Sequence, residues 1–200
     1  MADLNLILCD EEGMDVTAGQ TRREMLIAAT MAGATGVLGA SRASAATVDS
    51  ATPAKAPRAE WIYDAVALLQ KEVPHGRTIR GERFRVPIIG GSFAGPSLRG
   101  EIIAGGYDWQ LVRADGYWEI AADYFMQTND GVQIHIRNNG LWHSKTGDWP
   151  ADYAVTTPQF EAPEGPYAWL NHYVFTGTIN PAGTAEAPAV KLSIFRLVVD

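Results

Sequence analysis

The sequence predicts an all-β fold, a closed antiparallel barrel of about eight or nine strands with a central cavity. Three observations predict it. Glycines at six positions surround one short apolar segment within residues 90–109, and in a sheet such glycines mark corners and bulges. Asp-Gly steps at 115–116 and 130–131 separate segments of strand character, as in hairpins. No stretch after residue 60 keeps helical spacing. Strands joined by short turns must protect their edges, and the glycine corners favour closure over two stacked sheets.

The expected strands follow one another along the chain. Aromatic and β-branched residues predict the first at 60–69, where a short helix is the alternative. Alternating basic and apolar residues predict the second at 80–89. The remaining strands are expected at 98–103, 107–113, 117–128, 132–141, 153–160, 167–177 and 190–199. The segment at 142–151 is expected to be a loop, long enough for a lid or a crossover.

The first 45 residues have the features of an export signal. Arg22 and Arg23 precede an apolar run of small residues that ends near Ala43-Ser44-Ala45, a candidate cleavage site. This pattern resembles a twin-arginine signal and predicts a periplasmic or secreted protein. The run is too short and too rich in glycine and alanine for a stable membrane span. An amphipathic helix packed on the domain is the alternative.

The rest of the chain divides into a linker and one domain. Residues 46–58 have a linker composition, with two prolines and no periodicity, and residues 59–200 are expected to form a single barrel. Without the signal, the 16 basic residues fall to 13 and the 23 acidic residues to 17, a net charge of −4. Mild acidity argues against a nucleic-acid partner. Cys9 lies in the signal, so no disulfide is expected in the mature protein.

Several classes of site are not predicted. The four histidines are scattered and show no spacing typical of metal ligands, so no metal site is expected. A phosphate-binding loop, a dinucleotide fingerprint and a nucleophile elbow are also not found in the sequence, and no cofactor is expected. A homo-oligomer is compatible with the sequence.

Three segments carry a family resemblance. They read GGSFAGPSLRGEIIAGGYDWQ, YWEIAADYFMQTNDGVQIHIRNNG and PQFEAPEGPYAWLNHYVFTG, and they resemble the domain-of-unknown-function 3237 family, also called uncharacterised protein family 0311. The resemblance extends over roughly residues 60 to 200. It implies a calycin-like antiparallel barrel with a central cavity, and it implies no particular activity. Tyr107 departs from the small residue expected before Asp108, which suggests an altered corner.

Two residues are candidates for catalysis. Asp108 follows two glycines and precedes Trp109, so we expect it near a barrel mouth, where an indole would raise its pKa by desolvation. It would then suit a general acid or base, and a turn-capping role is the alternative. Asp123 and Tyr124 are adjacent in a strand and face opposite sides. We expect Tyr124 inside, where it could stabilise an oxygen, or serve only in packing.

The other candidates would bind a substrate. Trp109 would supply an apolar wall beside Asp108. His135 and Arg137 share one strand face and could hold a carboxylate or phenolate, or simply face solvent. In the strand expected at 167–177, alternate residues share a face and would form a pocket wall with an amide donor. These residues are Trp169, Asn171 and Tyr173.

Two functions fit this pattern. The first is a cofactor-independent lyase or isomerase that acts on a small, mostly apolar or aromatic molecule in the barrel, with Asp108 moving a proton. The second is a lipocalin-like protein that binds or carries such a molecule without catalysis. The sequence leaves both open.

Overall fold

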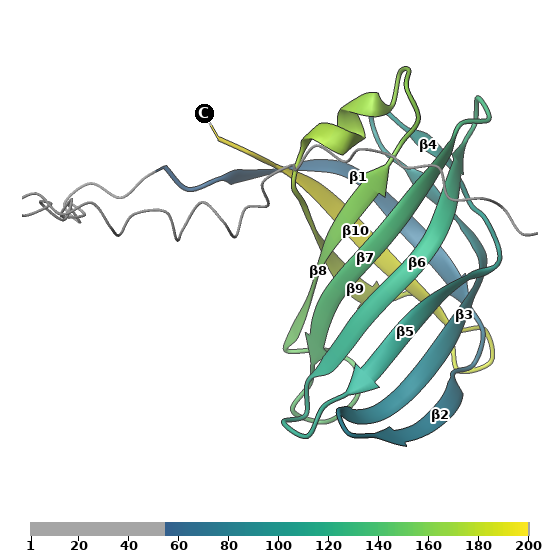
Figure 1. The fold of residues 1–200 in the computed structure, drawn as a ribbon, viewed down its shortest axis with the longest axis vertical. Coiled ribbons are helices and arrows are strands. Elements are labelled where there is room, and N and C mark those ends of the chain that lie inside the picture. The colour runs from purple at the N-terminus through teal and green to yellow at the C-terminus, as the bar shows by residue number, and fades with distance from the viewer. Residues whose placement is uncertain (1–54, 200) are drawn as a thin grey trace, which may run out of the picture. The chain divides into compact units, whose positions relative to one another are not determined.

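The computed structural model describes residues 55–199, which form a closed antiparallel β-barrel (Figure 1). The predicted export signal at 1–45 and most of the predicted linker lie outside the described residues. The closed all-β architecture expected from the sequence is confirmed. No helix within residues 55–199 has the length and apolar character needed to cross a membrane.

Ten strands build the barrel, and most of them coincide with alternating segments of the sequence. Their bounds are β1 (Arg58–Leu69), β2 (Val73–Thr78), β3 (Gly81–Ala94), β4 (Arg99–Ile102), β5 (Gly106–Val112), β6 (Trp118–Thr128), β7 (Gln133–His143), β8 (Tyr153–Glu161), β9 (Phe175–Pro181) and β10 (Ala189–Val198). The Asp-Gly steps form the β5–β6 and β6–β7 turns, as predicted, with positive φ at Gly116 and Gly131.

The ten strands occupy eight positions around the barrel. The long strand β3 pairs along one edge with β1 and β2, and along its other edge with β4 and β5. From β5 and β4 the sheet continues through β6, β7, β8, β9 and β10, and β10 pairs with β1 to close the ring. The prediction of eight or nine strands therefore agrees with the number of positions, and two of these positions are each shared by two shorter strands.

Three sequence-based assignments need correction. The segment at 167–177 is not one strand, because Ala168–His172 forms a 3-10 helix and β9 begins at Phe175. Pro74-His75-Gly76 was expected to be a turn but lies within β2, where the pairing with β3 shifts register. Strand β7 runs on to His143, so the loop expected from residue 142 starts later. Pro74 is tolerated in β2 because this strand lies at the end of the sheet order, where a missing backbone donor costs little. At 167–177, the run of aromatic residues suggested a strand that does not form.

The barrel interior is packed at one end and hollow at the other. The main core fills the end that carries β4 and the 3-10 helix, at the top of Figure 1, with Tyr63, Phe93, Ile102, Tyr124, Met126, Ile134, Ile136, Leu170, Phe175 and Ile194. The opposite end, at the bottom of Figure 1, carries β2 and the β5–β6 turn. The cavity described below lies toward this second end.

Candidate functional site

A cavity of about 390 Å³ opens at the end of the barrel that carries the β5–β6 turn. Its lining combines aromatic, aliphatic and polar side chains. The lining residues are Glu72, Asp108, Gln110, Trp118, Ile120, Trp142, Gly147, Asp148, Trp149 and Ile179. This volume is within the range of small-molecule sites in proteins.

Asp108 is the carboxylate that β5 points into this cavity. It pairs with Ala122 of β6, whose methyl side chain leaves the carboxylate room on the inner face. Gln110 Nε2 donates a 2.7 Å hydrogen bond to Oδ2, and the backbone N–H of Ala121 donates a 3.0 Å bond to Oδ1. Burial raises the pKa of Asp108 to about 6, and the two hydrogen bonds limit the rise. Such a group is suited to exchange protons near neutral pH.

Three indoles, which we call the indole cluster, form the aromatic wall of the cavity: Trp118 of β6, Trp142 of β7 and Trp149 of the loop that follows. The rings of Trp118 and Trp142 meet edge to face at 5.7 Å, and those of Trp142 and Trp149 do so at the same distance. Phe84 stacks on Trp118 at 6.0 Å. Edge-to-face packing holds each ring against its neighbour.

Several inner polar atoms have no hydrogen-bond partner within residues 55–199. They include Trp142 Nε1 at the cavity wall and, on the same inner face of the barrel, Asn138 Oδ1 and Thr156 Oγ1. Asn138 is 2% exposed and Thr156 is fully buried. A buried polar group without a partner costs free energy, so these atoms are natural partners for a ligand or for water. Asn138 pairs with Ala122, so it flanks that small residue on the side opposite Asp108.

Trp109, His135 and Arg137 do not line the cavity, contrary to the binding role expected for them. Strand alternation that turns Asp108 inward turns Trp109 outward, where it packs against His75 at 4.7 Å and lies under Arg83. His135 pairs with Asp123 at 2.7 Å on the outer face of β6 and β7. Arg137 lies exposed on the same outer face.

Trp169, Asn171 and Tyr173 also do not form the expected pocket wall, because the segment is not a strand. Asn171 caps the preceding loop, with its side-chain amide donating to the carbonyl of Ala162 and accepting from its N–H, each at 2.8 Å. Trp169 and Tyr173 instead both lie against the Arg196 guanidinium, at 5.9 and 4.6 Å from it, and their rings meet edge to face at 6.4 Å.

Tyr124 points inward, as predicted, but belongs to the packed end. It is 5% exposed and is part of the main core. Burial raises the pKa of its phenol well above the usual value. The cavity lining does not include it, so the structure does not place it beside Asp108's cavity as a second catalytic group.

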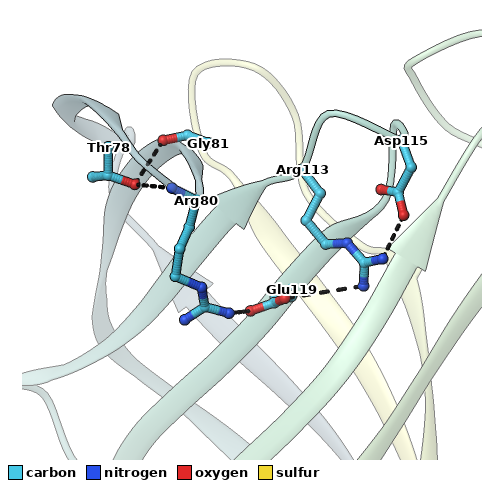
Figure 2. Close-up of polar contacts among 6 residues, drawn as sticks. All are labelled: Thr78, Arg80, Gly81, Arg113, Asp115 and Glu119. Atoms are coloured by element: carbon cyan, nitrogen blue, oxygen red, sulfur yellow. Dashed lines mark hydrogen bonds and ion pairs between the residues drawn. The ribbon is translucent and has the colours of Figure 1, made fainter.

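Two arginines near the open end are directed to the outer surface. Arg80, from the β2–β3 turn, and Arg113, from the β5–β6 turn, converge on Glu119 of β6 (Figure 2). Arg113 also contacts Asp115. Strand alternation places Glu119 outside and its neighbour Trp118 inside. This network therefore joins two turns at the open end without contributing charge to the cavity.

Sequence reasoning missed most of the cavity wall. Trp118, Trp142 and Trp149 were not singled out, because two of them fall in or beside a predicted loop. A signal was available for the first two, since Trp118 and Trp142 stand at equivalent positions near the ends of the two arms of the hairpin around Gly131 and are paired across it. Counting residues in pairs outward from the turn at Gly131 places Trp118 and Trp142 on the same face of the hairpin.

The fold and the cavity define a class of protein: antiparallel β-barrels with a partly polar interior cavity that opens at one end. Within that class, the chain belongs to the family described as protein of unknown function DUF3237, whose model matches residues 57–197. The family expected from the sequence is confirmed.

Relatives of the chain share this architecture. A UPF0311 protein of Clostridium acetobutylicum is 32% identical over 128 residues, which cover 58% of this chain and 81% of the relative. The crystal structure of a β-barrel like protein from Acinetobacter baumannii matches with a TM-score of 0.64 and 29% identity, covering 74% of this chain and 99% of that one. A conserved protein of unknown function from Rhodopseudomonas palustris matches with a TM-score of 0.65 and 25% identity, covering 74% of this chain and 100% of that one.

Proposed function

We propose that the barrel binds a small, mostly apolar or aromatic molecule in its cavity and that Asp108 transfers a proton to or from it as a general acid or base. The observation that carries the proposal is the position of the Asp108 carboxyl. It lies in a cavity walled by the indole cluster, with its pKa raised to about 6 by burial. A perturbed carboxyl in a largely apolar pocket is a common feature of catalytic sites.

The surroundings of Asp108 support a role as base at neutral pH. A carboxyl with a pKa of about 6 is mostly ionised at pH 7 and still basic enough to accept a proton from a weakly acidic C–H or O–H group. Removing such a proton leaves negative charge on the ligand oxygen. The unpartnered N–H of Trp142, a residue of the cavity wall, would stabilise this charge once a small side-chain shift exposes the closed-off atom to the ligand. The reaction class supported is therefore proton transfer next to a carbonyl or phenol, as in an isomerase or lyase that needs no cofactor.

Hydrogen–deuterium exchange of 2-tetralone tests this proposal. The ketone is a small aromatic molecule, and the proton at its C1 carbon would pass to an Asp108 oxygen and be replaced by deuterium from the solvent. We expect exchange, followed by NMR in deuterated buffer, to be faster with the protein than without it. Asp108→Asn should lower that acceleration by about a hundredfold or more.

A matched variant separates the chemistry from changes in the fold. Asp123→Asn alters an aspartate on the outer face of the neighbouring strand, where it pairs with His135, and should leave the exchange rate unchanged. Equal rates for the native protein and Asp108→Asn would overturn the catalytic role.

The second candidate is a protein that binds or carries the molecule without catalysis. The observation that favours it is that Tyr124, the other catalytic candidate, lies in the packed end and not in the cavity lining. Binding of 2-naphthol, measured by quenching of tryptophan fluorescence, discriminates the two functions. Tight binding without any exchange of 2-tetralone supports carriage, whereas exchange that depends on Asp108 supports catalysis.

The proposal includes export through the twin-arginine route. It is supported by the paired Arg22 and Arg23, the weakly apolar run and the Ala43-Ser44-Ala45 motif. Replacing both arginines by lysine keeps the charge and removes the pair. In a bacterium with an active twin-arginine system, the native protein should appear in the periplasmic fraction as a shortened chain. The double variant should stay in the cytoplasm at full length, and equal export of both proteins would contradict the route.

A further inference from the structure

The charge of the cavity wall is one-sided. Three of its lining residues are carboxylic acids, Glu72, Asp108 and Asp148, and the lining includes no lysine, arginine or histidine. Asp108 lies on the inner face of β5, whereas Glu72 and Asp148 are exposed residues at the opening. A wall of this kind gives the cavity a negative potential, which attracts cations and repels anions.

Three arginines near this end of the barrel lie on its outer surface and not in the cavity wall. Arg80 and Arg113 extend over the outer surface and are paired with Glu119 and Asp115 (Figure 2). Arg83 lies on the outer face of β3, over the ring of Trp109. The charges of Arg80 and Arg113 are thus balanced on the outside, and the cavity lining holds no positive partner for its three carboxylates.

The indole cluster adds a second attraction for a cation. Its rings are steeply inclined, at 70° between Trp118 and Trp142 and at 74° between Trp142 and Trp149. They therefore turn different faces and edges toward the space that they line. Indole faces are the strongest aromatic partners of ammonium groups, and inclined rings around one space are the arrangement that binds methylated ammonium.

The indole cluster also carries a hydrogen-bond donor that has no acceptor among the described residues. Trp142 is 9% exposed, yet its Nε1 has no acceptor within the described residues. The atom lies on a residue of the cavity wall. The atom is closed off from solvent, so an acceptor on the frame of a bound molecule reaches it only when a neighbouring side chain shifts.

We propose that the cavity binds organic ammonium compounds, small molecules in which a tertiary or quaternary amine is joined to an apolar or aromatic frame. The ammonium group lies against the indole cluster and between the carboxylates, and the frame fills the apolar part of the wall beside Ile120 and Ile179. This inference rests on the proposed function, because it names the ligand class of the same cavity. It also excludes small organic anions as ligands.

Three probes of nearly the same shape test the charge preference. Phenyltrimethylammonium is a cation, tert-butylbenzene is its neutral carbon counterpart, and benzenesulfonate is an anion of similar size. Binding to the barrel is measured by titration of tryptophan fluorescence and by calorimetry at low salt. We expect the cation to bind at least tenfold more tightly than the anion, with a difference that shrinks as salt is added.

Variants of the lining residues test whether the preference for the cation comes from the cavity. Glu72→Gln and Asp148→Asn should each weaken binding of the cation about fivefold, which corresponds to an exposed charge interaction of about 1 kcal/mol. Neither should change the affinity for tert-butylbenzene. Trp118→Leu should also weaken binding of the cation. Trp109→Leu and Asp123→Asn, both on the outer face, should leave its affinity unchanged.

The outcomes separate this inference from the proposed function. If tert-butylbenzene binds in the cavity but the cation binds no better than the anion, the ammonium class is wrong and the cavity remains a binding site. Equal weakening of the cation and of tert-butylbenzene by the charge variants would also overturn the inference. If none of the three probes binds, both the ammonium class and binding of small aromatic molecules are contradicted.

Discussion

Gln110 holds Asp108 through a 2.7 Å hydrogen bond between two side chains that β5 directs to the same inner face of the barrel. With the N–H of Ala121 on the other oxygen, this bond favours the ionised carboxylate, while burial favours the neutral acid. The balance places the pKa of Asp108 at about 6. Burial, the Gln110 amide and the Ala121 N–H therefore set the protonation state of Asp108 together.

Replacing Gln110 by leucine should raise the pKa of Asp108 above 6. The substitution removes a donor to the charged form and keeps the burial, so we expect an increase of about one unit. A ¹³C NMR titration of the aspartate carboxyl groups measures it. Gln159→Leu, on the exposed outer face of β8, is the control and should not move that pKa. An unchanged or lower pKa in Gln110→Leu would show that the hydrogen bond does not stabilise the carboxylate.

Asp108 should make the barrel less stable as pH rises from about 4 to about 6. The folded pKa of about 6 exceeds the ordinary value of 3.8, so the native state binds more protons than the unfolded state in this window, and the free energy of unfolding falls with rising pH. The loss is complete above pH 6 and amounts to about 3 kcal/mol.

Urea unfolding of the native protein and of Asp108→Asn between pH 3.5 and 7.5 measures this effect. The stability of the variant relative to the native protein should increase across the window and then level off. Both proteins contain the other carboxylic acids of the cavity, Glu72 and Asp148, so the difference between the two proteins isolates Asp108. A constant difference across the range would contradict the raised pKa.

Leu111 should contribute more to stability than the charges around it. It is 1% exposed, although it belongs to the outer face of β5, where it pairs with Glu119 and Arg83. Leu111→Ala should cost about 2 to 4 kcal/mol in the free energy of unfolding. Glu119→Gln, which breaks the ion pairs of Figure 2, should cost less than about 1 kcal/mol because they are partly exposed.

The exposed Leu68, with 44% of its surface accessible, provides the matched control. Leu68→Ala should cost less than about 1 kcal/mol. Chemical denaturation of the three variants at one pH gives the comparison. A loss in Glu119→Gln as large as that in Leu111→Ala would mean that the ion pairs, and not the buried leucine, stabilise this end of the barrel.

Gly177 should be required by close packing among β8, β9 and β10. A Cβ atom there would lie 2.7 Å from Cδ1 of Ile194 and 2.8 Å from Oγ1 of Thr156, so Gly177→Ala should cost about 1 to 3 kcal/mol. Ile194→Val removes that Cδ1 atom. The valine substitution should therefore be less destabilising in the alanine background than in the native protein, as a double-mutant cycle would show. Additive effects would contradict this contact.

The barrel was predictable from the sequence because its signals are local. The turns at Gly116 and Gly131 fix two hairpins, and alternation within β6 and β7 fixes their faces. The strand predicted at 167–177 was wrong because that prediction also used only local signals. A run of aromatic residues satisfies strand propensity, but the 3-10 helix there depends on Asn171 bonding to Ala162 and on Leu170 entering the core, and these are tertiary contacts.

The candidate site was predictable only in part. Asp108 was singled out because of its glycine corner, and the structure does direct it into the cavity. Trp109 was expected beside it, but adjacent residues in a strand face opposite sides, and the choice of the inner side follows from pairing with β6. The role of Trp142 and Trp149 depends on how the strand end and the following loop meet at the opening, which no local pattern encodes.

Indole N–H chemical shifts test the central claim, that the hollow end of the barrel is the ligand site, most directly. The protein has six tryptophans. Three form the indole cluster, and Trp61, Trp109 and Trp169 lie elsewhere. In a titration of ¹⁵N-labelled protein with 2-naphthol, we expect the N–H signals of the indole cluster to move together and the other three to stay in place. Shifts confined to Trp61, Trp109 or Trp169, or no shifts at saturating 2-naphthol, would contradict the claim.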